Sequence, residues 1–164
     1  MAFSITIAER QLDKPILQSL TSTGVANPVH EPGYTVMSND GREFVYVQFD
    51  SSSVAAVAGA PAVWASTSAD NEFVVTSDVS DGGLVAVGAF LSILTDTYFG
   101  WIQTKGFLKD VPCTGAQDEV AVTAAVGATV DAKWSTVTVG GTTAEKGVAL
   151  ETSSGGYGNI NLVS

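Results

Sequence analysis

The chain has 164 residues, of which 45% are hydrophobic and only 15% are charged, and its formal net charge is −10. Its 7 lysines and arginines are scattered singly along the sequence, whereas nucleic-acid binding depends on clustered basic residues that neutralise phosphates. We therefore expect neither a nucleic acid nor an anionic membrane as a partner. The length is sufficient for one domain, or for a domain with an arm, without disulfide support.

The cysteine content and the N-terminal sequence indicate where the protein is made. The single cysteine, Cys113, has no partner for an intrachain disulfide, which is typical of synthesis in a reducing cytoplasm. Residues 1–7 lack the charged and apolar regions of a signal peptide, and we expect no export by a cleaved signal. The longest apolar-rich run, residues 84–94, is far too short to span a bilayer as a helix.

The first third of the chain differs from the rest. Residues 3–7 alternate like a short strand, and residues 9–20 have helix-like apolar spacing that Pro15 interrupts. Residues 21–33 are rich in proline and glycine. We predict an N-terminal arm over residues 1–33, followed by a β-rich domain over residues 34–164. A first strand with a long surface loop is the alternative that the sequence leaves open.

From residue 34 onward, β-type residues recur at short intervals. Asn39-Asp40-Gly41 predicts a hairpin between strands at 34–37 and 43–49. Residues 54–60 fit either a helical turn or a small-residue strand, and a loose Gly-Ala theme does not predict an internal duplication. Many short strands with glycine-rich turns predict an all-β fold, with a single β-sandwich or barrel-like domain. The remaining predicted strands are 62–66, 72–76, 84–94, 98–104, 119–123, 134–139, 147–151 and 159–163.

The strand at 98–104 is the most distinctive of these. Alternation places Tyr98 and Ile102 on one face and Phe99 and Trp101 on the other. Because both faces carry apolar side chains, we expect the strand to be covered on both sides, the second cover being another sheet or another chain. These four residues are our candidates for central packing or an oligomer interface.

Residues capable of catalysis or metal binding are few. His30 is the only histidine, and neither it nor Cys113 has a partner motif for nucleophilic catalysis. Acidic loops at 78–81 and 117–119 could supply oxygen ligands for calcium, but neither resembles an EF-hand, and turn formation is the preferred interpretation. We predict no catalytic residue, no metal and no cofactor. The three tryptophans could form a sugar-stacking platform, although aromatic residues on strands are more often part of a core.

Two neighbouring segments carry a family resemblance. Val87-Gly-Ala-Phe90 precedes Phe99-Gly-Trp-Ile-Gln-Thr-Lys-Gly106, and Gly147-Val-Ala-Leu150 precedes Gly155-Gly-Tyr-Gly158 near the C-terminus. An apolar segment ending in Gly-Ala/Val, an aromatic-Gly-Trp-Val/Ile-Gln strand and a Gly-x-Ala-Leu strand with a glycine-rich hairpin occur together in head decoration, or cement, proteins of tailed bacteriophages. Over residues 84–163 the chain resembles these virion structural proteins.

The resemblance implies a function in capsid stabilisation. Such proteins are β-rich, often trimeric, and bind the capsid exterior where major capsid subunits meet. The expected partners are thus the major capsid protein and further copies of the chain, in a virion assembled from protein made in the host cytoplasm. The arm would reach a neighbouring subunit, with contacts from Phe3, Ile5, Ile7, Leu12, Ile16 and Leu17. The alternatives are another virion component (tail, baseplate or head fibre) and a carbohydrate-binding β-sandwich module.

Overall fold

The computed structural model describes residues 24–51, 54–65, 73–82, 86–114, 125–136, 146–150 and 156–163. These residues form strands and a single helical turn, α3 (Val79–Gly82). The predicted all-β class is therefore confirmed. The strands are β1 (Thr35–Met37), β2 (Glu43–Phe49), β3 (Pro61–Trp64), β4 (Val74–Thr76), β5 (Ala86–Phe90), β6 (Phe99–Thr114), β7 (Ala125–Val130), β8 (Lys133–Thr136), β9 (Gly147–Ala149) and β10 (Tyr157–Leu162).

The N-terminal strands close a β-barrel. Pairing runs from β2 to β4, β3, β5 and β6 and returns from β6 to β2, with only the β2–β4 pair parallel. We call this closed set the first barrel. The hairpin predicted around residues 39–41 is present and adds β1 to the outer edge of β2. Closure removes the unpaired edges that five strands would otherwise expose.

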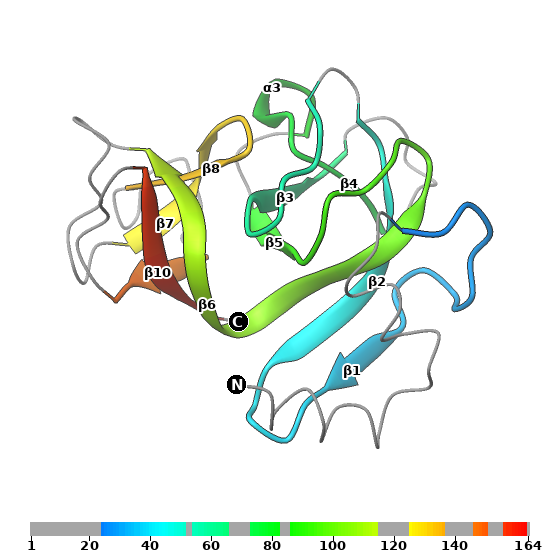
Figure 1. Cartoon of the computed structure of the whole chain (residues 1–164), viewed down its shortest axis with the longest axis horizontal. Coiled ribbons are helices and arrows are strands. Elements are labelled where there is room, and N and C mark those ends of the chain that lie inside the picture. Colours follow the sequence, from blue (N-terminus) through cyan, green and yellow to red (C-terminus); the bar gives the residue numbers. More distant parts are fainter. Residues whose placement is uncertain are drawn as a thin grey trace.

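The C-terminal strands form a second closed set of pairings. Here β6 pairs with β10, followed by β9, β7 and β8, and β8 returns to β6 in parallel. We call this set the second circuit. The long strand β6 belongs to both sets, and Figure 1 shows it bending between them, with β2 and β5 along its first half and β10 along its second.

The two sets have the same topology, which the sequence did not lead us to expect. In chain order, the first strand of each set pairs in parallel with the third and antiparallel with the fifth. The second strand pairs antiparallel with the third and fourth, and the fourth pairs antiparallel with the fifth. The second half of β6, with β7, β8, β9 and β10, thus corresponds to β2, β3, β4, β5 and the first half of β6.

The register of the two sets agrees as well. Phe90 lies opposite Ile102 in the first barrel, and Ala149 lies opposite Ile160 at the corresponding place in the second circuit. The matched strands read Phe99-Gly-Trp-Ile-Gln103 and Tyr157-Gly-Asn-Ile-Asn161. Four kinds of residue therefore recur at equivalent positions: an aromatic residue, a glycine, an isoleucine and a residue with a side-chain amide. This pattern is too short to be recognised from the sequence without the strand pairing.

Strand β6 is much longer than the strand predicted at residues 98–104. It continues through Gly106, where φ is +95°, a conformation that favours glycine. A Cβ atom at Gly106 would lie 2.8 Å from Arg42 Cγ, so the glycine also allows the β1–β2 hairpin to approach. The strand predicted at 98–104 ends before Gly106, whereas this glycine allows β6 to continue and to bend.

Each closed set has its own core. The aliphatic and aromatic interior of the first barrel consists of Val47, Phe49, Ala56, Ala60, Ala62, Val75, Phe90, Leu94 and Ile102. A separate cluster consists of Val63, Ala86, Ala89, Leu108, Val111, Cys113, Trp134, Ala149, Ile160 and Leu162. Because the second cluster contains residues of β3 and β5, it also joins the second circuit to the outside of the first barrel.

Several predicted elements differ in extent. Of the strand predicted at 84–94, the described residues form strand at Ala86–Phe90 and not at 91–94, and residues 54–60 form neither helix nor strand. The small-residue strand Ala125–Val130 was not predicted. The strand predicted at 119–123 and residues 1–23 of the predicted arm lie outside the described residues. Among the described helical residues, none belongs to a helix with the length and apolar character needed to cross a bilayer.

Candidate interaction surface

An aromatic cluster lies on the outer face of the first barrel. Trp101 from β6 and Tyr46 from β2 are fully buried, with ring centroids 5.2 Å apart, and Phe44 completes the buried group. Phe99 stacks on Tyr46 at 6.1 Å. Alternation along β2 and β6 directs these rings away from the barrel interior, because successive side chains of a strand point to opposite faces.

Residues 24–34 cover this cluster. Val25 pairs with Phe99 through backbone hydrogen bonds of 2.9 Å in each direction, and Gly33 donates its N–H to the Tyr46 carbonyl oxygen at 2.7 Å. The Val29 N–H donates to the Tyr46 hydroxyl at 3.3 Å. Burial raises the pKa of the Tyr46 hydroxyl, and this hydrogen bond opposes the rise. The second cover of the aromatic strand is thus a segment of the same chain.

His30 is half-buried in this cover instead of extending into solvent. Its ring stacks on Tyr34 at 5.1 Å and approaches Trp101 at 5.7 Å. Two buried ring nitrogens, His30 Nε2 and Trp101 Nε1, have no hydrogen-bond partner among the described residues. Aromatic stacking therefore dominates the surroundings of His30. The proline-rich sequence around it gave no signal for this, since the contacts come from β2 and β6.

The four predicted packing residues separate into two pairs. Trp101 and Ile102 are fully buried, on opposite faces of β6, while Tyr98 and Phe99 are half-buried at the start of that strand. Ile102 contributes to the interior of the first barrel. The six predicted arm contacts all precede residue 24 and lie outside the described residues: Phe3, Ile5, Ile7, Leu12, Ile16 and Leu17.

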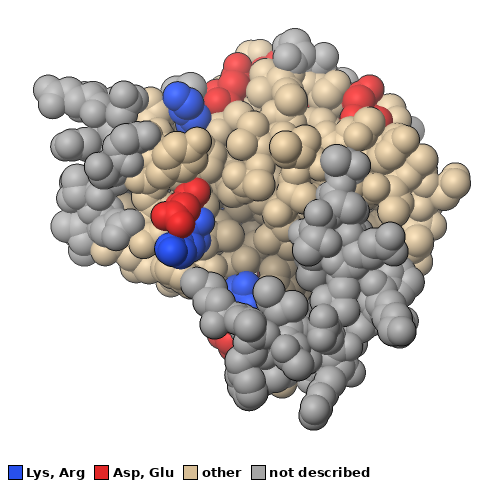
Figure 2. Space-filling model, viewed as in Figure 1, with Lys and Arg blue, Asp and Glu red and all other residues tan. Residues whose placement is uncertain are grey.

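Large apolar side chains are exposed on the cover segment and on β1, which follows it. The exposed fractions are 47% for Val29, 49% for Tyr34 and 60% for Met37. Tyr34 stacks on His30, and β1, which carries Met37, pairs with β2. These three exposed side chains lie within one short stretch of the chain, and exposed apolar groups that gather in one region mark interaction sites on soluble proteins. We call residues 29–37 the apolar margin. Figure 2 shows that most of the described surface on one face is uncharged, with few scattered charged residues.

The tryptophans do not share an exposed surface. Trp101 and Trp134 are fully buried, whereas Trp64 is 39% exposed and packs edge-on against Phe73, with ring centroids 5.9 Å apart. A platform for sugar stacking requires exposed ring faces. The structure therefore contradicts the idea of a platform built from all three tryptophans and leaves Trp64 as the exposed one.

The acidic loop at residues 78–81 stabilises the local turn. Asp78 Oδ1 accepts a 2.9 Å hydrogen bond from the Ser80 N–H, and Asp131 Oδ1 accepts a 2.9 Å bond from the Val79 N–H. No group of three or more His, Cys, Asp or Glu residues suited to a metal ion occurs in the described part of the chain. The second acidic loop, residues 117–119, lies outside that part.

Two titratable groups have shifted pKa values because they are withdrawn from water. Burial raises the pKa of the Cys113 thiol to about 11, which keeps it protonated and unreactive near neutral pH. Burial lowers the pKa of Lys146, while the negative charge of Glu43 opposes that change. Both residues belong to the packed region around the second circuit.

No protein-family model matches the sequence, and no curated protein is significantly similar to it.

Proposed function

We propose that this protein is a decoration protein of a phage head, which binds the outer capsid surface and stabilises contacts between major capsid subunits. The observation that carries the proposal is the apolar margin, where Val29, Tyr34 and Met37 are exposed at the C-terminal end of the predicted arm and directly after it. In this proposal the margin and the arm bind neighbouring capsid subunits together, without catalysis.

The physical basis of this binding is modest affinity repeated over many copies. Removing apolar surface from water contributes roughly 25 cal/mol per Å², and many copies on one shell multiply weak individual contacts. An arm that becomes ordered on docking loses conformational entropy but gains contacts that bridge subunits. A net charge of −10 also prevents competition for packaged DNA.

Co-sedimentation with empty heads of the phage that encodes the protein tests this proposal. We expect stoichiometric binding, and we expect deletion of residues 1–20 to leave a folded protein that does not bind. The double variant Val29→Ser/Met37→Ser should also bind much more weakly. The matched control is Ile93→Ser/Val57→Ser, since these residues are 58% and 42% exposed and lie outside the margin.

Four outcomes would overturn parts of the proposal. Full binding after the deletion would exclude the arm, and equal loss in both double variants would exclude the margin as a specific contact. Protein that stays free of heads would favour a tail, baseplate or head-fibre component. Binding to glycan arrays through Trp64, the exposed tryptophan, would favour a carbohydrate-binding module.

A further inference from the structure

The outer face of the second circuit corresponds to the aromatic cluster of the first barrel. Phe44 lies opposite Gln103 in the first barrel, and Phe107 lies opposite Asn161 at the corresponding place in the second circuit. Leu108 belongs to the core, so alternation along β6 directs Phe107 outward, as it directs Phe44 outward from β2. An outward phenylalanine therefore recurs in the repeated topology.

An outward leucine recurs in the same way. The Leu91 N–H donates to the Trp101 carbonyl oxygen at 3.4 Å, and the Leu150 N–H donates to the Asn159 carbonyl oxygen at 2.9 Å. Leu150 directly follows Ala149, a core residue, and therefore points away from the interior of the second circuit. The two leucines occupy equivalent positions beside the matched strands.

The two faces differ in how far they are covered. Phe44 is 5% exposed, whereas Phe107 is 40% and Leu150 48% exposed. Tyr157, which matches Phe99 in the repeat, is 57% exposed. We call Phe107, Leu150 and Tyr157 the second outer face. It is an exposed apolar surface whose counterpart in the first barrel is covered by the chain itself.

The repeated topology explains this difference. Residues 24–34, which cover the first barrel, come before its first strand, β2. The second circuit has no such preceding segment, because its first strand is the second half of β6 and follows the first half without a break. A cover for the second outer face has to come from elsewhere.

The sequence of the cover segment has a counterpart in the predicted arm. Val25-Ala-Asn-Pro-Val29 has an aliphatic residue three positions before proline and another directly after it, and Leu12-Asp-Lys-Pro-Ile16 has the same pattern. Of the 5 prolines in the chain, only Pro15 and Pro28 have leucine, isoleucine or valine at both places. The arm therefore contains the one further segment of this kind.

Charges on the second outer face complement those of the arm segment. Where the first barrel has Tyr46, two residues after its outward phenylalanine, the second circuit has Lys109, whose Nζ lies 3.5 Å from the exposed Asp110 carboxylate. The arm segment contains Asp13 and Lys14, an acid and a base that can face this pair with opposite signs. Exposed ion pairs contribute little energy, so the charges set the register while apolar contacts supply the stabilisation.

The arm is long enough to reach this face of its own molecule. Leu12 lies thirteen positions before Val25, and Pro112, which is opposite Tyr157, lies thirteen positions after Phe99 on β6. An extended chain spans roughly 3.3 Å per residue, so the arm matches the length of β6 between these points. Because β6 bends (Figure 1), the direct path is shorter than the strand.

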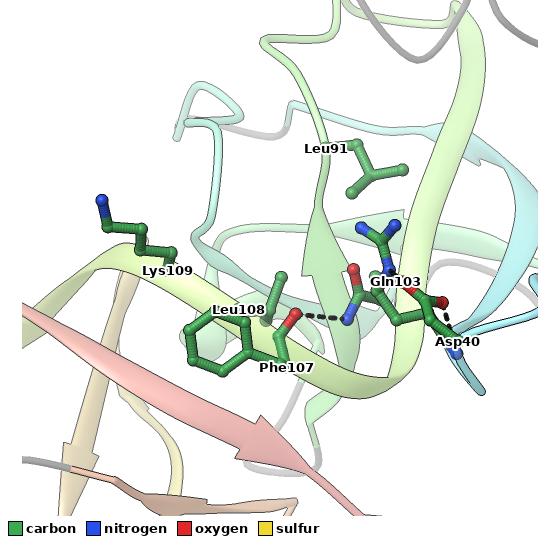
Figure 3. Close-up of a pocket in the computed structure, with 7 residues that line it drawn as sticks. Asp40, Leu91, Gln103, Phe107, Leu108 and Lys109 are labelled. Carbon is green, nitrogen blue, oxygen red and sulfur yellow. Dashed lines mark hydrogen bonds and ion pairs between the residues drawn. The ribbon is translucent and has the colours of Figure 1, made fainter. Parts of the chain in front are cut away.

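A cavity of about 370 Å³ lies along this path, at the bend of β6. Leu91 and Gln103 line it from the first barrel, and Phe107 and Lys109 line it from the second half of β6. Figure 3 shows the first two residues to the right and the other two to the left. The hollow thus connects the outer faces of the two sets.

We propose that residues 12–16 cover the second outer face of the same chain, as the cover segment covers the first barrel. Leu12 lies beside Tyr157, and Asp13 faces Lys109. The first residues of the chain extend beyond this anchor and stay available for capsid contact. The inference concerns the free protein and does not rest on the proposed capsid function.

Disulfide capture in the full chain tests the inference. In Leu12→Cys/Tyr157→Cys, oxidised glutathione should form a disulfide within one chain about tenfold faster than in Leu12→Cys/Trp64→Cys, because docking holds the first pair together. Trp64 is 39% exposed and belongs to β3, outside the second outer face. The buried Cys113 thiol, with a pKa raised to about 11, does not compete. Non-reducing electrophoresis and mass spectrometry measure the products.

Charge reversal localises the contact. Lys109→Glu, added to the Leu12/Tyr157 cysteine pair, should slow capture several-fold, and Asp13→Lys in the same protein should restore the rate. The matched control is Lys133→Glu, which makes the same charge change at an exposed lysine of β8 and should leave the rate unchanged.

Hydrogen exchange of the unsubstituted chain gives a second measurement, which does not depend on cysteine variants that fold. The backbone amides of residues 12–16 should exchange several-fold more slowly than those of residues 1–8, and Phe107→Ser/Leu150→Ser should remove the difference. Equal capture rates for the two cysteine pairs, disulfides that join two chains, failure of Asp13→Lys to restore the rate, or equal exchange of the two segments would each overturn the inference.

Discussion

Trp134, whose ring is fully buried in the core of the second circuit, donates its Nε1–H to the carbonyl oxygen of Gly59 in the first barrel at 2.8 Å. The two residues are 75 positions apart in the sequence. Gly59 itself lies against Val111 and Pro112 of β6, where an added Cβ would come within 3.1 Å of Val111 Cγ1. This contact joins the second circuit to the first barrel close to β6, the strand that the two sets share.

Replacing Trp134 with phenylalanine should destabilise the protein by about 1–2 kcal/mol, because the partly buried Gly59 carbonyl loses its donor. Urea unfolding followed by circular dichroism measures the change. The exposed Trp64 supplies the control, since Trp64→Phe should alter the free energy of unfolding by less than about 0.5 kcal/mol. Equal effects of the two substitutions would show that the Gly59 hydrogen bond contributes nothing.

The same substitution at Trp101 should have a different result. Trp101 Nε1 is buried without an acceptor in the described part of the chain, so Trp101→Phe removes a donor that has no partner there and should cost less than Trp134→Phe. Trp101→Ala, in contrast, should cost on the order of 3–5 kcal/mol, because the ring fills the cluster with Tyr46 and Phe44. A near-neutral Trp101→Ala would contradict central packing and assign the ring to an interface.

The raised pKa of Cys113 predicts a loss of stability at alkaline pH. Burial raises the pKa of the thiol to about 11 in the folded protein, whereas the unfolded chain keeps the ordinary pKa of 9.0. The unfolded chain therefore releases its proton first, and the stabilisation present below pH 9.0 is lost as the pH rises toward 11. The slope approaches about 1.4 kcal/mol per pH unit at most.

Cys113→Ala provides the comparison for that measurement. Tyr46, with a raised pKa, and Lys146, with a lowered one, titrate at high pH in both proteins. The difference between the two pH profiles of unfolding free energy thus isolates the thiol. Parallel profiles from neutral to alkaline pH would mean that the thiol ionises equally well in the folded and unfolded states.

Gly100 and Leu94 should be energetically coupled. A Cβ atom at Gly100 would lie 2.5 Å from Leu94 Cδ2, and Leu94 is only 3% exposed. Gly100→Ala alone should cost about 1–3 kcal/mol through overpacking, and Leu94→Ala alone about 2–5 kcal/mol through a cavity. In the double variant the new methyl group occupies part of that cavity, so the total should be smaller than the sum.

Gly88 offers a matched test without that rescue, because a Cβ there would lie 2.6 Å from the backbone oxygen of Gln103. No side-chain substitution removes a backbone oxygen, so Leu94→Ala cannot relieve this clash. The free-energy costs of Gly88→Ala and Leu94→Ala should therefore add in the double variant. Additive costs in the Gly100 double variant, measured by the same chemical unfolding, would show that Leu94 relaxes freely around the added methyl group.

The sequence by itself determined the local and compositional properties of this protein. Asn39-Asp40-Gly41 sets a hairpin because its residues favour tight turns, and the alternation at 98–104 places apolar groups on both faces of the strand. These signals act between near neighbours, and the hairpin and the burial of Trp101 and Ile102 follow from them. The sparse, dispersed charge is likewise a property of composition alone.

Only the tertiary structure decided how the strands close and where the cavity lies. Parallel pairing of β2 with β4 and of β6 with β8 joins segments far apart in the sequence, and no local pattern encodes such pairing. A glycine such as Gly106 is typical of a turn. In the structure, however, β6 continues through it, with the β1–β2 hairpin packed against it and the Gln103 side chain hydrogen-bonded to the carbonyl oxygens of Lys105 and Phe107. The repeated topology and the cavity both depend on that bend.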